Sequence, residues 1–254
     1  MKRILTAVVA IPLVLVATLY SPDWLFAILV SVFAALALEE FLQLGSKRGG
    51  DRAGRWFLIP GALVTASFYF GEPELVLMAL SLATLILMSV SVFGGTIETA
   101  FSRVGFGLAG LVYCCVTLGF IVLLGRELVI LLFAIIWVGD SAAYYGGRAF
   151  GRHLLAPRVS PKKTVEGAVA GLIGSIVAGA VAGVWWLGEP AATVAIISAI
   201  VAVAGQLGDL AESVLKRSAG VKDSSSILPG HGGILDRLDS TFFAAPVLYW
   251  LFNS

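Results

Sequence analysis

Long apolar runs, each of about 17 to 24 residues, recur from one end of the chain to the other. A helix of about 20 apolar residues crosses the hydrocarbon core of a bilayer, and a soluble core cannot bury so many runs of that length. Hydrophobic residues make up 59% of the 254 positions and charged residues 13%, against roughly 25% charged in an ordinary soluble domain. The sequence therefore predicts an all-α fold, a polytopic transmembrane helical bundle.

Several other classes are excluded by the same pattern. The runs are continuous rather than alternating, which argues against an outer-membrane barrel. The net charge is +1 and no basic arm is present, so we expect no nucleic-acid partner. Cys114 and Cys115 are adjacent inside an apolar run, where small buried apolar roles are expected and a redox role is the alternative.

Charged residues, glycine and proline bound nine predicted helices. Their expected ranges are 4–20, 24–44, 56–71, 75–93, 104–124, 128–145, 167–187, 191–214 and 239–252. We group about five helices in an N-terminal region, residues 1–125, and the others in a C-terminal region, residues 126–254. In the seventh helix, Gly167/Gly171 and Gly179/Gly183 form G-x-x-x-G patterns, which indicate close helix packing.

The loops predict an orientation, because Lys and Arg are retained on the cytoplasmic side of a membrane. With the N-terminus inside and the C-terminus outside, sixteen of the seventeen basic residues lie in predicted cytoplasmic segments, and Arg126 is the exception. The external turns are short, whereas two cytoplasmic loops are long, residues 146–166 and 219–239. Binding and catalytic residues concentrate on such loops, so we expect the functional site there.

The eighth predicted helix ends in a polar stripe. Its members lie at helical spacing and share one face: Asp209, Glu212, Ser213, Lys216 and Arg217. An acidic residue inside a membrane costs about 2.5 to 3.5 kcal/mol and usually marks function. The alternative is an interfacial salt bridge between Glu212 and Lys216 that closes an ordinary helix end.

A glycine turn, Pro-Gly-His-Gly-Gly at residues 229–233, follows this helix. Its glycines expose backbone N–H groups, which suits close approach to phosphate oxygens. Basic and acidic residues alternate around it: Lys216, Arg217, Lys222, Arg237, Asp209, Asp223, Asp236 and Asp239. Carboxylate oxygens are the ligands that Mg²⁺ prefers when it bridges phosphates. The pattern predicts a site for a polyphosphate and its metal, and hence phosphoryl or nucleotidyl transfer.

The segment from Ser213 to Asp239 resembles the signature of the phosphatidate cytidylyltransferases, S-x-x-K-R-x4-K-D followed by P-G-H-G-G-x-x-D-R-x-D. A second family-like stretch, residues 139–167, begins with Gly-Asp-Ser and contains Ser-Pro-Lys-Lys-Thr at 160–164. The two motifs cover about the C-terminal 110 residues, whereas the first half agrees in hydrophobic pattern alone. Ser225 departs from the pattern at a position where glycine is expected in many members.

The resemblance implies that CTP and phosphatidate give CDP-diacylglycerol and pyrophosphate with Mg²⁺, at the cytoplasmic face of a bacterial inner membrane. By position it assigns the metal to Asp209, Asp236 and Asp239, and phosphate contacts to Lys216, Arg217, Lys222 and Arg237. Asp223 and His231 complete the catalytic set, His231 as a phosphate-orienting donor rather than a base or metal ligand. Substrate binding falls to Ser213, Gly230, Gly232, Gly233, Ser160, Lys162, Lys163 and Asp140. A second metal ion and a homodimer are left open.

Two other functions are left open by the residues. One is a CTP-dependent lipid kinase acting on a polyprenol or phytol, which would transfer a γ-phosphoryl group. The other is a transporter that uses the intramembrane acids. Transport would favour acids near the bilayer midplane and two pseudo-symmetric halves, whereas the charges here gather at one predicted face and no such symmetry is visible.

The orientation can be tested by cysteine labelling. Cysteines placed at Glu74 and Glu189 should react with a membrane-impermeant thiol reagent from outside, and those at Arg52 and Ser225 only from the cytosol, because basic loops stay inside. Labelling is measured in intact cells and in inverted vesicles, with the parent chain as the control. External labelling of Ser225→Cys would contradict a cytoplasmic site.

Overall fold

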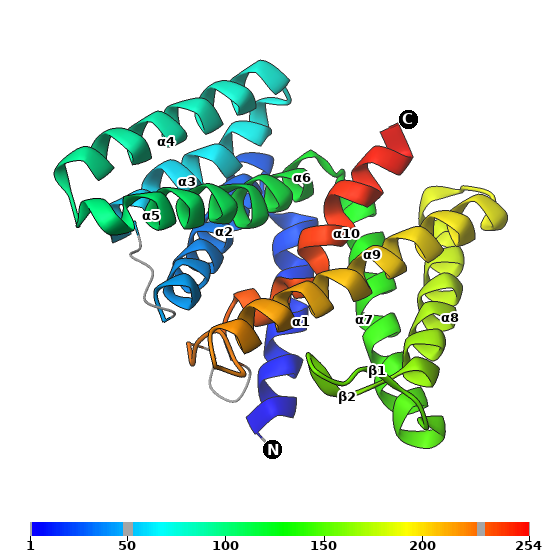
Figure 1. Cartoon of the computed structure of the whole chain (residues 1–254). Coiled ribbons are helices and arrows are strands. Elements are labelled where there is room, and N and C mark those ends of the chain that lie inside the picture. The colour runs from blue at the N-terminus through cyan, green and yellow to red at the C-terminus, as the bar shows by residue number, and fades with distance from the viewer. Residues whose placement is uncertain (1, 48–52, 228–231, 254) are drawn as a thin grey trace. The chain divides into compact units, whose positions relative to one another are not determined.

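The computed structural model describes residues 2–47, 53–227 and 232–253, with side chains from residue 11 onward (Figure 1). Its helices are α1 (Lys2–Tyr20), α2 (Asp23–Ser46), α3 (Leu58–Ser67), α4 (Pro73–Phe93), α5 (Ile97–Gly110), α6 (Thr117–Leu123), α7 (Arg126–Phe150), α8 (Val165–Ala182), α9 (Ala191–Ser218) and α10 (Leu235–Asn253). Short 3-10 turns flank α3 at Arg55–Phe57 and Phe68–Phe70. Two π-helical turns extend the apolar helices: Leu111–Val116 joins α5 to α6, and Gly183–Leu187 continues α8.

The predicted all-α, polytopic bundle is confirmed. Among the described residues, six helical segments are long and apolar enough to cross a membrane: 23–46, 73–93, 97–123, 126–150, 165–187 and 191–218. Each coincides with one of the predicted apolar helices. The only strands in the described part of the chain, β1 (Leu154–Ala156) and β2 (Ser160–Thr164), form a small antiparallel hairpin.

The chain folds into two compact units. The first contains residues 1–123 together with 215–238, and the second contains residues 124–214 together with 239–254. The first unit therefore takes residues from both halves of the sequence, whereas the second comes almost entirely from the C-terminal half. The sequence suggests a different division, after residue 125, into an N-terminal region and a C-terminal catalytic region. That division stays a prediction.

In the first unit, α2, α3, α4 and α5 pack on one another (Figure 1). Their contacts bury large apolar side chains completely, among them Leu38, Phe57 and Leu87. Cys114 and Cys115 are also fully buried and are free thiols, which confirms the expected small apolar role.

In the second unit, α8 packs closely on both α7 and α9. A Cβ atom added at Gly171 would lie 2.9 Å from Cβ of Ala143 in α7, and one at Gly183 would lie 2.6 Å from the Val194 side chain in α9. Side chains at these glycines would push the helices apart, because protein interiors have no spare volume. The prediction that the G-x-x-x-G patterns mark close helix packing is confirmed.

Both long loops are shorter than the predicted ranges 146–166 and 219–239. Helix α7 continues to Phe150, because the glycines after its predicted end keep it in contact with α8, and the β1–β2 hairpin fills the rest. Glu166 holds that hairpin by accepting hydrogen bonds from the backbone N–H groups of Arg152 and His153 at 3.0 and 3.2 Å. Helix α10 begins at Leu235 rather than at residue 239, since carboxylates cap its first amides.

Gly146 and Gly105 provide a matched test of helix packing. Gly146→Ala should lower stability by about 1–3 kcal/mol, because the new methyl group would lie 2.3 Å from Cβ of Ala170. Gly105→Ala should leave stability unchanged or raise it by up to about 1 kcal/mol, since no atom lies within 4 Å of its Cβ position. Thermal unfolding in detergent measures both variants. Equal midpoints would contradict the close approach of α7 and α8.

Candidate active site

The signature loop, residues 219–234, connects α9 to α10 and belongs to the first unit. The predictions for Gly230 and His231 lie outside the described residues and stay predictions. Two carboxylates accept hydrogen bonds from the described parts of the loop, 219–227 and 232–234. One belongs to Asp236, which the sequence singles out, and the other to Glu40, which it does not.

Asp236 lies in the first turn of α10 and accepts four hydrogen bonds. Its Oδ2 atom accepts from the backbone N–H and the hydroxyl of Ser224, both at 2.8 Å, and from the N–H of Gly233 at 2.8 Å. Its Oδ1 atom accepts from Nζ of Lys216 at 2.6 Å. The two charged side chains are only 6% and 11% exposed. Asp236 thus connects both described parts of the signature loop, at Ser224 and Gly233, to Lys216 at the end of α9.

Glu40, in the last third of α2, is fully buried and also accepts four hydrogen bonds. Its Oε1 atom accepts from the Ser225 hydroxyl at 2.6 Å and from the N–H of Ile234 at 3.0 Å. Its Oε2 atom accepts from the Ser224 hydroxyl and from the N–H of Leu235, both at 2.8 Å. Sequence reasoning missed this residue. The available signal was an acid inside a predicted span, the same signal that drew attention to Asp209.

Two glycines of the signature, Gly232 and Gly233, allow the loop backbone to approach these carboxylates closely. Gly232 has a positive φ of 78°, which favours glycine. A Cβ atom at Gly233 would lie 2.2 Å from Oε2 of Glu40 and from Oγ of Ser224. The N–H of Gly233 and the N–H groups of the two residues after it donate to carboxylates, although the sequence assigns the exposed amides of this turn to phosphate oxygens. Phosphate binding by Gly232 and Gly233 stays a prediction.

The other predicted residues of the first unit lie at its surface. Lys222, Asp223, Arg217 and Arg237 are exposed, and the guanidinium group of Arg217 donates to the carbonyl of Val221 at 2.9 Å. The structure therefore separates the predicted cations into two kinds. Lys216 is buried against a carboxylate, whereas the three others are accessible to a soluble anion.

In the second unit, Lys163 of β2 donates to the carboxylate of Asp209 on α9. This ion pair joins the family-like stretch of residues 139–167 to the polar stripe of α9. Asp239, near the start of α10, lies close enough to Asp209, Glu212 and Asp140 for their charges to interact. Small residues on α9 allow that approach, because a Cβ atom at Gly208 would lie 2.6 Å from the carbonyl oxygen of Asp239.

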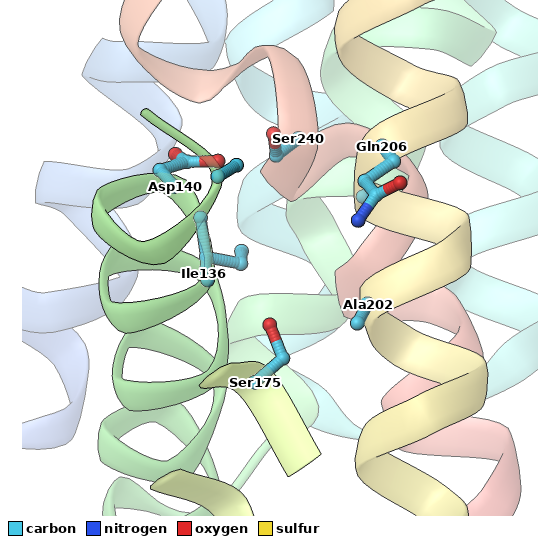
Figure 2. Close-up of a pocket in the computed structure, with 9 residues that line it drawn as sticks. Ile136, Asp140, Ser175, Ala202, Gln206 and Ser240 are labelled. Atoms are coloured by element: carbon cyan, nitrogen blue, oxygen red, sulfur yellow. The ribbon is translucent and has the colours of Figure 1, made fainter. Parts of the chain in front are cut away.

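A pocket in the second unit has one of these acids, Asp140, in its lining (Figure 2). Asp140, Ser175, Gln206 and Ser240 line it together with small and apolar residues. Gln206 donates from Nε2 to the carbonyl of Ala168 at 3.0 Å, which ties α9 to α8. Sequence reasoning also missed Gln206 and Ser175, which are uncharged and therefore give weaker signals inside apolar helices. Of the remaining predicted substrate contacts, Lys162 is exposed, and Ser160 and Ser213 are half-buried.

The acids of the second unit fit the donor chemistry of Mg²⁺, since Asp140, Asp209, Glu212 and Asp239 supply carboxylate oxygens. Within the described ranges, no three acidic, histidine or cysteine side chains already converge as a metal-binding group. Asp236 belongs to the other unit, and its two oxygens accept the four hydrogen bonds given above. The metal therefore stays a prediction, and Asp209 and Asp239 fit it better than Asp236 does.

The buried pair of Lys216 and Asp236 gives a testable stability prediction. Lys216→Met and Asp236→Asn should each lower the free energy of unfolding by about 3–5 kcal/mol, because each leaves its buried partner without its counter-charge. The double variant should lose less than the sum, since the two residues are in contact. Denaturant unfolding in detergent measures the three variants, and strictly additive losses would contradict the pairing.

Comparison with known proteins extends the resemblance from the C-terminal motifs to the whole chain. Residues 1–254 match the model of the cytidylyltransferase family. Phosphatidate cytidylyltransferase of Bacillus subtilis is 34% identical over 262 residues, 98% of this chain and 94% of that protein. The protein of the same name from Staphylococcus saprophyticus is 34% identical over 267 residues, covering 97% and 96%.

The relative of that name from Synechocystis sp. is more similar over a shorter region, with 48% identity over 128 residues. That region is 50% of this chain and 43% of the Synechocystis protein. The family match over every residue, together with relatives aligned over nearly the full length, confirms the resemblance. The chain belongs to the cytidylyltransferase family.

Proposed function

We propose that this chain transfers the cytidylyl group of CTP to phosphatidate, giving CDP-diacylglycerol and pyrophosphate in glycerophospholipid synthesis. One observation carries the proposal: relatives named phosphatidate cytidylyltransferase align with 97–98% of the chain at 34% identity. The motif from Ser213 to Asp239 lies within that alignment and supplies the charged residues that the reaction needs.

The reaction is a displacement at the α-phosphorus of CTP. An oxygen of the phosphatidate phosphate forms the new bond, and the bond to the oxygen bridging the α- and β-phosphates breaks. Pyrophosphate leaves with its electron pair. The second pKa of a phosphate monoester is about 6 to 7, so the nucleophile is already largely ionised at neutral pH. The protein needs no strong base, and the main barrier is repulsion between anions.

The described residues offer positive charge for that task. Lys222, Arg217 and Arg237 lie exposed around the signature loop, where they can bind the triphosphate and stabilise the departing pyrophosphate. Holding the two anions in a fixed orientation contributes as well. Asp236 and Lys216 are assigned to the loop's shape, because their charges are buried against each other.

We assign Mg²⁺ to the acids of the second unit, with Asp209 and Asp239 as its holders. A bound Mg²⁺ would neutralise phosphate charge and so reduce the repulsion between the substrates. Lys163, now paired with Asp209, is a second cation beside the same carboxylate. In the absence of metal it would keep Asp209 from repelling Asp239.

The six long apolar helical segments among the described residues make this an integral membrane protein. We propose the bacterial inner membrane, with the signature loop on the cytoplasmic side, because CTP is a cytosolic solute and phosphatidate is a lipid. The distribution of basic residues supports that orientation. A homodimer and a second metal ion are compatible with the proposal and are not required by it.

Position-specific labelling of CTP tests the proposal. With purified protein, phosphatidate and Mg²⁺ in detergent, label in the α-phosphate should enter the lipid fraction and label in the γ-phosphate should leave as pyrophosphate. Both should stop when the metal is removed with a chelator. Appearance of the γ label in a lipid would instead identify a lipid kinase, and no transfer of either label to any lipid would refute the proposal.

A further inference from the structure

We infer that Glu40 of α2 is a positioning residue of the nucleotide site, which holds residues 224–225 and 234–235 of the signature segment in the arrangement that CTP binding requires. The inference rests on the proposed function and deepens it. It means that an N-terminal helix, α2, contributes a residue to the site, although both sequence motifs lie in the C-terminal half. Four observations carry it: the burial of Glu40, the identity of its donors, their places in the loop and the behaviour of the neighbouring residue Glu39.

A fully buried carboxylate is unfavourable unless every oxygen has partners. Among the described residues, the hydrogen-bond donors to Glu40 come from the signature loop and from the first residue of α10. Two of its donors are backbone N–H groups at the N-terminus of α10, where the helix dipole also favours a negative charge. Burial of the charge and the shape of the loop therefore depend on each other.

The four donors lie at the two ends of the loop's central part. Ser224 and Ser225 precede it, and Ile234 and Leu235 follow it. The glycine turn that the family signature contains lies between them in sequence. One carboxylate thus holds the described residues on both sides of the glycine turn in place before a nucleotide binds, and such preorganisation favours binding and catalysis.

Ser225 adds an observation of its own, because its side chain bonds Glu40 directly. Its hydroxyl donates to Glu40 at 2.6 Å and accepts the N–H of Ile227 at 3.2 Å. The Ser225 side chain therefore strengthens the attachment of the loop to Glu40. Ser225→Ala removes these bonds and introduces no charge.

Glu39 is the matched control, since it is adjacent, acidic and also buried. Its Oε1 atom accepts from Nε2 of Gln43 at 2.9 Å and from Nε of Arg55 at 3.4 Å, both outside the signature loop. Glu39→Gln and Glu40→Gln make the same chemical change one residue apart. Glu40, unlike Glu39, accepts hydrogen bonds from the N–H groups of Ile234 and Leu235. Glu40→Gln should therefore release one of these amides, whereas Glu39→Gln should not.

The experiment measures steady-state kinetics and hydrogen exchange of the purified chain. Each carboxylate oxygen of Glu40 accepts from one backbone N–H group, that of Ile234 or that of Leu235. In Glu40→Gln, the side-chain NH₂ group replaces one of these oxygens and so faces an N–H group that can only donate. We expect the KM for CTP to rise by about ten-fold or more, as for the loss of one buried hydrogen bond. The KM for phosphatidate should stay within about two-fold. Amides of residues 233–236 should exchange faster in Glu40→Gln, and Glu39→Gln should match the parent in all three measurements.

A parental KM for CTP in Glu40→Gln would overturn the inference, and so would equal increases for both substrates, which indicate general destabilisation. If Glu40→Gln does not insert into membranes, Ser225→Ala takes its place with an expected rise of about three-fold or more in the KM for CTP. An unchanged KM and unchanged exchange in that variant would also overturn it. If the parent transfers no cytidylyl group, the proposed function fails, and equilibrium binding of CTP replaces its KM as the deciding measurement.

Discussion

The beginning of α10 depends on two buried carboxylates that bind backbone amides. A helix leaves its first four N–H groups without partners inside the helix, and burial makes each unpaired group costly. Here Glu40 and Asp236 accept from three consecutive amides, those of Gly233, Ile234 and Leu235. The helix starts where these acceptors are available. The positions of the signature loop and of its exposed cations follow from that start.

This arrangement changes how the glycines of the signature are understood. A glycine-rich turn beside cations is typical of a phosphate site, because its amides are exposed. In the structure, Gly232 supplies a positive φ, and Gly233 leaves room for the Glu40 carboxylate and the Ser224 hydroxyl. A glycine pattern thus identifies a place where backbone and an anionic group approach each other closely. It does not distinguish a carboxylate of the protein from a phosphate of a substrate.

Acids within apolar helices fall into two groups in this chain. Glu40 and Asp236 are satisfied by hydrogen bonds and shape the first unit. Asp209 and Asp239 lie in the second unit with other acids nearby, and Lys163 pairs with Asp209. Like charges held close together are unfavourable without a cation. That imbalance makes the second group the better candidate for metal binding.

The sequence by itself determined the fold class, the approximate helix limits and the chemical character of the site. Those properties are local, because the length of an apolar run and the spacing of charges along one helix can be read directly from the chain. The tertiary structure determined which residues form hydrogen bonds and ion pairs with each other. Glu40 bonds residues 184 to 195 positions away, and Lys163 bonds Asp209 46 positions away. No local pattern specifies such pairs, since they depend on which helix faces which after packing. Only the folded chain shows that Asp236 faces a buried lysine and that an acid of α2 belongs to the signature loop.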